Sequence, residues 1–131
     1  MKKVFITRRI PELGISMLKE RGYDVTVSTK ARPLTKKELI KALSRGNYDA
    51  VLTLLTDPID EDVMKAAPSV KIFANFAIGF NNINIEAAKA RNIFVSNTPG
   101  GGAERVAEHT WALILALTCR VVEGDAYLRK G

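Results

Sequence analysis

Short apolar runs alternate with helix-like segments through residues 1–99, and this alternation most restricts the fold of the chain. Consecutive residues within these runs are apolar, and in a strand they point to opposite faces. This pattern is typical of strands that are buried on both faces. Strands that alternate with helices build a parallel sheet covered by helices on both faces and joined by right-handed crossovers. We therefore predict an α/β fold. The expected strands span residues 4–6, 25–27, 50–55, 70–77 and 93–95.

Helix-capping residues support this division of the chain. Thr35 and Glu38 form a capping-box pattern, and Asp60 and Asn84 are good N-caps for the helices that follow them. Asn92 is suited to end a helix in the left-handed conformation. The helices are therefore expected to begin directly after these caps.

The last segment differs from the rest. Residues 103–129 contain no strong helix breaker except Gly124, so we expect one helix roughly 40 Å long. Residues 111–117 (WALILAL) are apolar on every face, and a helix of that kind must be buried all round. One small sheet can cover only one side of it. We therefore expect the helix from Val106 to Val122 to meet a second domain, a second copy of the chain, or both.

Composition excludes several classes of protein. The net charge of +6 comes from Lys and Arg side chains scattered over several segments, without interleaved aromatic residues, so we expect no nucleic-acid partner. The single cysteine, Cys119, excludes an internal disulfide and fits the cytoplasm. The run 111–117 is too short to cross a membrane, and no secretory apolar segment follows Met1. We expect a cytoplasmic protein without a metal site.

A ligand site is expected where the strands end, because open parallel sheets bind ligands beyond the carboxyl ends of their strands. Those ends fall at residues 7–9, 55–58, 77–80 and 97–100. Gly79 has two interpretations at this stage. It either allows a tight turn, or it lets backbone N–H groups approach a small anion closely.

Two known functions of this architecture are not supported by the residues at the expected positions. A phosphate-accepting receiver domain needs acidic residues after the first strand, where this chain has Thr7, Arg8 and Arg9. A dinucleotide fingerprint needs a third glycine at the position that Arg105 occupies. Residues 100–102, three consecutive glycines, are therefore interpreted as a flexible joint at a helix start.

Three stretches together resemble the D-isomer-specific 2-hydroxyacid dehydrogenases. The first stretch is residues 75–83 (NFAIGFNNI), and the second is residues 97–100 (NTPG) with 106–110 (VAEHT). The third, residues 7–11 (TRRIP), resembles in particular the glyoxylate and hydroxypyruvate reductase branch of the family. The resemblance covers essentially the whole chain, in order. It implies a flavodoxin-like substrate-binding domain over residues 1–99, then a hinge and a long interdomain and dimerisation helix over residues 100–131.

The same resemblance implies an enzyme that transfers a hydride between NAD or NADP and a small 2-keto or 2-hydroxy acid. In such an enzyme the backbone N–H groups of Ile78 and Gly79 bind the substrate carboxylate, and the loop with Leu55 and Thr56 closes over it. The position of Val106 faces the nicotinamide. The expected homodimer forms through the helix from Val106 to Val122.

The family's dinucleotide fingerprint, substrate-binding arginine, acidic partner and catalytic histidine are all expected beyond Gly131. His109, the only histidine, is interpreted as structural, so we assign no catalytic residue to this chain. We expect no cofactor on the chain by itself and no turnover. The alternative function is a non-catalytic α/β interaction module that dimerises. Asn81 and Asn84 stand where the family often has Asp.

Overall fold

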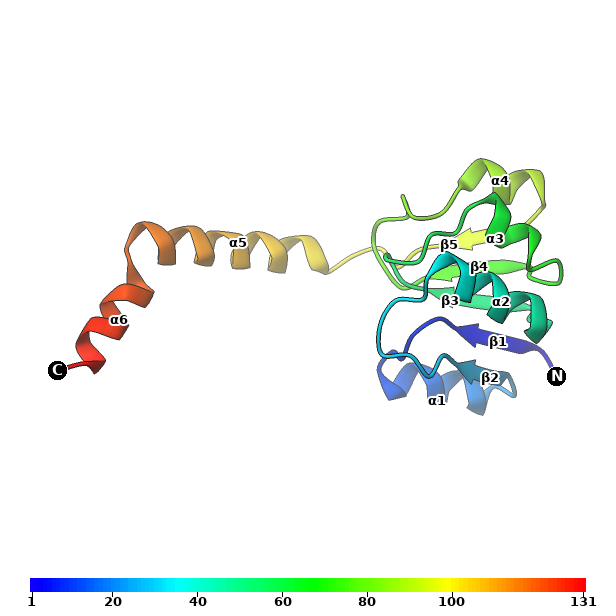
Figure 1. The fold of residues 1–131 in the computed structure, drawn as a ribbon, viewed down its shortest axis with the longest axis horizontal. Coiled ribbons are helices and arrows are strands. Elements are labelled where there is room, and N and C mark those ends of the chain that lie inside the picture. The colour runs from blue at the N-terminus through cyan, green and yellow to red at the C-terminus, as the bar shows by residue number, and fades with distance from the viewer. The chain divides into compact units, whose positions relative to one another are not determined.

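The computed structural model describes residues 1–131 and confirms the α/β fold. Five parallel strands form one sheet in the order β2-β1-β3-β4-β5 (Figure 1). This is the flavodoxin-like order, in which the direction of the winding reverses between β1 and β3. The strands are β1 (Lys3–Ile6), β2 (Asp24–Val27), β3 (Ala50–Thr53), β4 (Ile72–Asn75) and β5 (Phe94–Ser96).

Four helices connect these strands, and their predicted caps are confirmed. Thr35 accepts the N–H of Glu38 and Glu38 accepts the N–H of Thr35, so the capping box is complete. Asp60 and Asn84 accept the N–H groups that an N-cap should bind, and Asn92 has the left-handed φ of 54°. The helices are α1 (Glu12–Glu20), α2 (Lys36–Gly46), α3 (Glu61–Lys65) and α4 (Ile85–Ala90).

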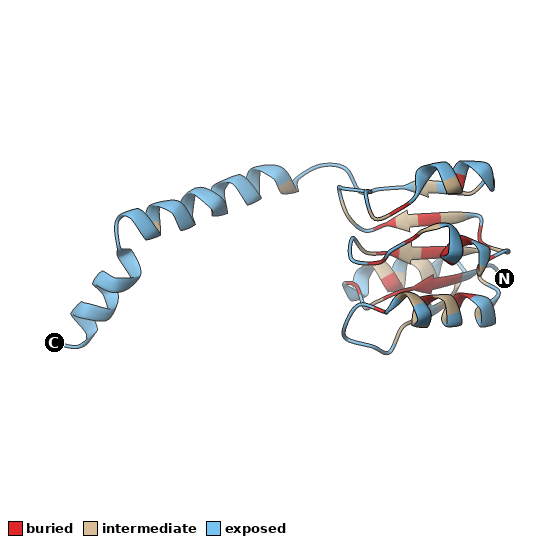
Figure 2. Cartoon of the chain, turned by 45° about the horizontal axis from the view of Figure 1, so that its top comes forward, coloured by how far each residue is buried: buried red, intermediate tan, exposed pale blue.

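The core lies on both faces of the sheet. On one face Phe73, which is fully buried, packs with Leu39 of α2 and Val63 of α3. On the other face Ile6 packs with Ile15 of α1. Figure 2 shows the buried residues concentrated along the strands. The loops that follow the strands therefore project from a sheet that is packed on both faces.

Two strands end earlier than the sequence predicts. β3 ends at Thr53 rather than at residue 55, because the N–H of Asp57 bonds to the carbonyl of Leu54 at 2.9 Å and the Asp57 carboxylate accepts the N–H of Leu54 at 2.8 Å. This turn removes Leu54 and Leu55 from the sheet. β4 spans Ile72–Asn75 rather than residues 70–77. As a result, Leu55 and Ala77 lie in loops.

The single long helix predicted over residues 103–129 is wrong. The structure has two helices, α5 (Gly102–Thr118) and α6 (Val121–Arg129), and the helix predicted from Val106 to Val122 therefore ends at Thr118. Arg120 adopts the left-handed conformation, with φ 51°, and so ends the first helix. At the end of α5 the N–H of Cys119 bonds to the carbonyl of Leu115 at 2.9 Å, and the N–H of Arg120 bonds to the carbonyl of Leu117 at 3.2 Å. Gly124, the expected weak point, lies inside α6.

The chain divides into two compact units, Met1–Pro99 and Gly100–Gly131. The first holds the sheet with α1 to α4, and the second holds α5 and α6. Neither α5 nor α6 has a buried residue, so the two-helix unit has no core of its own. None of the helices combines the length and the apolar character needed to cross a membrane.

Candidate functional site

The loops after β3 and β4 lie side by side at the carboxyl ends of the strands. Ile59 and Ile83 form an isolated parallel bridge between them, and the N–H of Ile59 bonds to the carbonyl of Asn82 at 2.8 Å. The structure brings two of the predicted site residues together, because a Cβ on Gly79 would lie 3.6 Å from Cδ1 of Leu55. Thr56 is exposed in the same loop as Leu55.

In the turn formed by residues 77–79, all three carbonyl groups accept a hydrogen bond, whereas none of the three N–H groups donates one. No N–H of these residues donates a hydrogen bond in the structure. The carbonyl oxygens of Ala77, Ile78 and Gly79 accept from the N–H of Thr98 at 2.9 Å, from Nδ2 of Asn97 at 2.8 Å and from Nδ2 of Asn75 at 2.8 Å. Successive backbone N–H groups that face one space make an anion-binding concavity.

The backbone conformation at residue 79 is not one that only glycine can adopt. Its φ lies outside the left-handed region, so a residue with a side chain could adopt the same conformation. A Cβ at this position would instead lie 3.3 Å from Oδ1 of Asn81 as well as close to Leu55. The backbone conformation of residue 79 therefore does not require a glycine, whereas Asn81 and Leu55 limit the space for a side chain at this position.

A buried polar network holds the two loops in one arrangement. Asn75, which is 2 % exposed, accepts the hydroxyl of Thr53 at 2.9 Å and donates to Oδ1 of Asn82 at 3.0 Å. Asn82 in turn donates to the carbonyls of Leu54 at 3.2 Å and Asp57 at 3.0 Å. Because buried polar groups are costly to leave unpaired, this network fixes the loop that carries Leu55 against the turn that carries Gly79.

Sequence reasoning assigned no role to Asn75, Asn82 or Asn97, although these asparagines set the geometry of the turn. A signal was available, since Asn75 ends a buried strand where an unpaired amide would be costly. The hydrogen bonds of Asn82 and Asn97 join residues 7 to 28 positions apart, so they depend on how the strands pair.

The turn carries no side chain that could transfer a proton. Residues 75–82 contain no ionisable side chain. The perturbed acids belong to ion pairs elsewhere: hydrogen bonds from Arg32 and then Lys30 hold the pKa of Glu38 far below its ordinary value. Lys2 likewise lowers the pKa of Asp49 at the opposite, amino-terminal edge of the sheet. No three His, Cys, Asp or Glu side chains converge to hold a metal ion.

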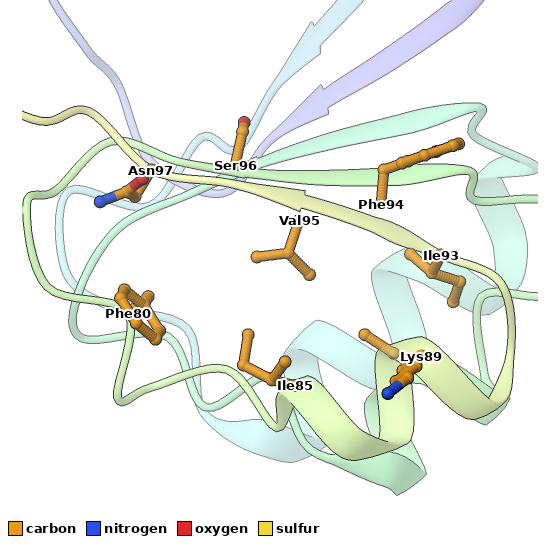
Figure 3. Close-up of a pocket in the computed structure, with 9 residues that line it drawn as sticks. Phe80, Ile85, Lys89, Ile93, Phe94, Val95, Ser96 and Asn97 are labelled. Atoms are coloured by element: carbon orange, nitrogen blue, oxygen red, sulfur yellow. The ribbon is translucent and has the colours of Figure 1, made fainter.

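An apolar pocket of about 440 Å³ lies between α4 and β5, next to the turn. Figure 3 shows Ile85 of α4 facing Val95 of β5 across it, with Phe80 at one end. Apart from Lys89, Ser96 and Asn97, its lining is apolar, and it includes neither Leu55, Thr56, Ile78 nor Gly79. The pocket is therefore a neighbour of the candidate site and not the site itself.

Comparison with known proteins decides the family. The profile of the family described as "D-isomer specific 2-hydroxyacid dehydrogenase, catalytic domain" matches residues 4–124. The chain belongs to this family. The matched range includes the loops after β3 and β4, the turn at residues 77–79, all of α5 and the start of α6.

Several known proteins are similar to the chain. The glyoxylate reductase of Thermofilum pendens is 46% identical over 98% of this chain. The crystal structure of the TT0316 protein from Thermus thermophilus is 38% identical over 98% of this chain, with a TM-score of 0.87. An NAD⁺-bound 3-phosphoglycerate dehydrogenase of Entamoeba histolytica is 27% identical over 88% of it, with a TM-score of 0.74.

The chain spans less than half the length of these proteins. It covers 38% of the Thermofilum pendens enzyme, 40% of the Thermus thermophilus chain and 38% of the Entamoeba histolytica chain. The region of this chain that matches the family runs through the flavodoxin-like unit and α5 into the first residues of α6.

The residues of this chain do not build a dinucleotide cradle. Such a cradle needs a glycine-rich turn between a strand and a helix, followed by a second parallel strand. The glycines at 100–102 precede α5, but α5 is followed by α6 and not by a strand. Gly100 and Gly101 have φ of 101° and 75°, a conformation that glycine adopts much more readily than other residues. Val106, the predicted cofactor contact, lies on α5.

Proposed function

We propose that the chain is the substrate-binding part of an NAD- or NADP-dependent oxidoreductase that transfers a hydride between nicotinamide and a small 2-keto or 2-hydroxy acid. One observation carries this proposal: the turn at residues 77–79 presents three free N–H groups while each of its carbonyls is held. A carboxylate is the group that all such acids share, and backbone N–H groups bind it without needing a charged side chain.

In this proposal the N–H groups of Ile78 and Gly79 receive the carboxylate. Leu55, whose Cδ1 would lie 3.6 Å from a Cβ on Gly79, and Thr56 belong to the loop that covers the bound acid. Leu55 is apolar and half exposed, so covering the acid with it would remove water from the carboxylate. Removing water strengthens the hydrogen bonds to the N–H groups.

The nicotinamide, when bound, supplies or accepts the hydride, and its cradle belongs to residues outside this chain. The similar structure from Entamoeba histolytica holds NAD⁺, and its chain is longer than this one. We propose that Val106 contacts the nicotinamide end of the cofactor in the whole protein. The chain's own contribution is to bind and orient the acid.

We further propose that residues 1–99 are the substrate-binding domain of a cytoplasmic enzyme and that residues 100–131 serve as hinge and interdomain segment. The second unit also carries the proposed homodimer contact. Its apolar side chains have no core to enter within their own unit, as the absence of buried residues in α5 and α6 indicates. The same observation supports the second candidate function, a dimerising interaction module without catalysis.

Titration of the ¹⁵N-labelled chain with sodium glyoxylate tests the binding part of the proposal. We expect the amide shifts to change at residues 77–79 and 55–56, with weak affinity because a charged partner for the carboxylate is lacking in the turn. Shifts that appear only elsewhere, for example around the pocket between α4 and β5, would show that the anion binds there and not at the turn.

A chimera tests the catalytic part. Residues 1–131 would replace the corresponding part of the Thermofilum pendens glyoxylate reductase, which is 46% identical to them. We expect the chimera to reduce glyoxylate with NADH or NADPH, and the same chimera with Gly79→Val to bind the cofactor but lose the reduction. A folded chimera that binds cofactor and reduces neither glyoxylate nor hydroxypyruvate would leave the interaction module as the better function.

A further inference from the structure

Asn97 lies directly beyond β5 and reaches across to the turn after β4. Its Nδ2 donates to the carbonyl oxygen of Ile78 at 2.8 Å. The next residue, Thr98, donates its N–H to the carbonyl of Ala77 at 2.9 Å and its hydroxyl to the carbonyl of Asn75 at 3.1 Å. Residues 97 and 98 therefore continue the contact between β5 and β4 past the end of the sheet, over the turn that presents the free N–H groups.

These hydrogen bonds control particular N–H groups because a peptide unit is planar. The carbonyl of one residue and the N–H of the next lie in the same plane and, in a trans peptide, point in opposite directions. The chain has no cis peptide. The Asn97 amide thus fixes the N–H of Gly79 through the Ile78 carbonyl, and the N–H of Thr98 fixes the N–H of Ile78 through the Ala77 carbonyl.

The same hydrogen bonds make the N–H groups better donors. A carbonyl that accepts a hydrogen bond polarises its peptide unit, which strengthens the hydrogen bond that the N–H of that unit donates. The Asn97 amide is neutral, so it does this without placing a charge beside the turn. The Asn97 side chain is exposed and belongs to neither apolar core cluster, so its contact with the turn is separable from the packing of the sheet.

We propose that Asn97 is a positioning residue for anion binding: its side-chain amide sets the direction of the Gly79 N–H that receives the substrate carboxylate. This inference rests on the proposed function of the turn and adds to it the group that orients one of its two donors. It makes a distinctive prediction. Loss of the Asn97 amide should weaken the Gly79 donor, while the Ile78 donor, which depends on Thr98, should change less.

The experiment compares three variants of the ¹⁵N-labelled chain. Asn97→Ala removes the amide, and Asn97→Asp keeps its size but replaces the donating group by an acceptor. Ser96→Ala is the matched control, because Ser96 is the exposed neighbour on β5 and makes no hydrogen bond through its side chain. Sodium glyoxylate is the probe, the amide shifts of Ile78 and Gly79 give the Kd, and the ¹⁵N heteronuclear NOE of the anion-free chain gives the order of the turn.

We expect Asn97→Ala to raise the Kd about fivefold, the effect of one lost hydrogen bond, and Ser96→Ala to leave it within about twofold of the original value. Asn97→Asp should raise the Kd further, since it adds a negative charge near the anion. The shift change at Gly79 should shrink relative to that at Ile78 in both Asn97 variants. An unchanged Kd with an unchanged Gly79 response in Asn97→Ala would overturn the inference.

Failure of the proposed function would look different. In that case the original chain would show no response at Ile78 and Gly79, and the heteronuclear NOE of the anion-free variants would decide the role of Asn97. A fall in the NOE at Gly79 in Asn97→Ala but not in Ser96→Ala would still support positioning of the turn. Equal values in the two variants would overturn it.

Discussion

The hydroxyl of Thr7 donates a 2.5 Å hydrogen bond to Oδ2 of Asp57 and so joins the carboxyl ends of β1 and β3. Both residues are buried, at 0 % and 1 % exposure, and the same carboxylate oxygen accepts the N–H of Leu54 at 2.8 Å. The winding of the sheet reverses between these two strands, which is where sheets of this kind bind ligands. Through Asp57, Thr7 therefore holds the loop that carries Leu55 and Thr56 in place beside the end of β1.

Replacing Thr7 by Val should destabilise the chain by about 1–3 kcal/mol, because the isosteric side chain leaves a buried carboxylate with one donor fewer. Urea unfolding measures the change. Thr26→Val is the control, since Thr26 is exposed on β2 and the same substitution there should change the free energy of unfolding by less than about 0.5 kcal/mol. Equal stability of the two variants would show that the Thr7 hydroxyl does not brace the loop.

Substitutions at Gly79 should weaken anion binding in proportion to their size. Ala places a Cβ 3.3 Å from Oδ1 of Asn81 and 3.6 Å from Leu55, which a small shift of the Asn81 side chain can relieve. Val adds two further methyl groups in the space that the anion needs. We expect Gly79→Ala to reduce the response of residues 77–79 to glyoxylate and Gly79→Val to abolish it, with both variants folded by circular dichroism. Full binding by Gly79→Val would place the anion elsewhere.

Acid should weaken the cap of α2 through Glu38. Its carboxylate accepts from Arg32 at 2.9 Å and from Lys30 at 2.8 Å, and these bonds, with the N–H of Thr35, hold its pKa well below the ordinary value of 4.5. The folded chain therefore binds fewer protons at Glu38 than the unfolded chain does. The contribution is complete above the ordinary pKa and is lost as the pH falls below it toward the folded pKa.

The measurement is the fall in Tm between about pH 7 and about pH 3, the window in which Glu38 becomes protonated in the unfolded chain. Glu38→Gln keeps an oxygen for the capping box but carries no charge, so its Tm should fall less than that of the original chain. Glu20→Gln, a substitution of an exposed glutamate outside any ion pair, should leave the fall unchanged. Identical curves for the original chain and Glu38→Gln would refute the role of Glu38.

The sequence predicted the fold well because the fold depends on local patterns. The capping residues Thr35, Asp60 and Asn84 act on N–H groups three positions away, and the structure confirms each of them. The end of β3 was placed two residues too late because Leu54 and Leu55 are as apolar as the strand. What ends the strand is the hydrogen bonding of Asp57, which hydrophobicity does not report.

The site was predictable in part. Leu55 and Gly79 were expected near each other through the family resemblance, and the structure places them in adjoining loops. The hydrogen bonding that holds the carbonyls of the turn was not predictable, because it depends on Asn97 reaching a carbonyl 19 residues away. The break between α5 and α6 was also missed, since it depends on a left-handed conformation at Arg120, a residue type that does not favour that conformation.

The chain by itself should not reduce glyoxylate. Hydride transfer requires a cofactor held against the acid, and the glycines at 100–102 do not form the cradle that would hold it. Purified chain mixed with glyoxylate and NADH or NADPH should leave the absorbance of the reduced nicotinamide unchanged. The chimera with the Thermofilum pendens enzyme is the positive control. Steady turnover by the chain alone, lost in Gly79→Val, would mean that the chain is an enzyme without the remainder.

The two-helix unit should associate in solution. Trp111, Leu113 and Leu117 lie on α5, which has no buried residue, and burial of each such side chain stabilises a contact by about 1.5–3 kcal/mol. A second copy of α5 offers the same apolar surface, and two-fold pairing is the commonest way for such surfaces to meet. Because the chain turns at Arg120, the contact is expected over α5, from Val106 to Thr118, rather than as far as Val122.

We therefore expect light scattering at tens of micromolar to give the mass of a dimer. Leu113→Glu and Leu117→Glu should each give monomer, because a carboxylate would have to be buried without a partner in the contact. Lys130→Glu adds the same side chain beyond the end of α6 and should leave the dimer intact. A soluble monomer in the original chain would contradict the association. Dimers that persist in both leucine variants would show that another surface of the chain pairs.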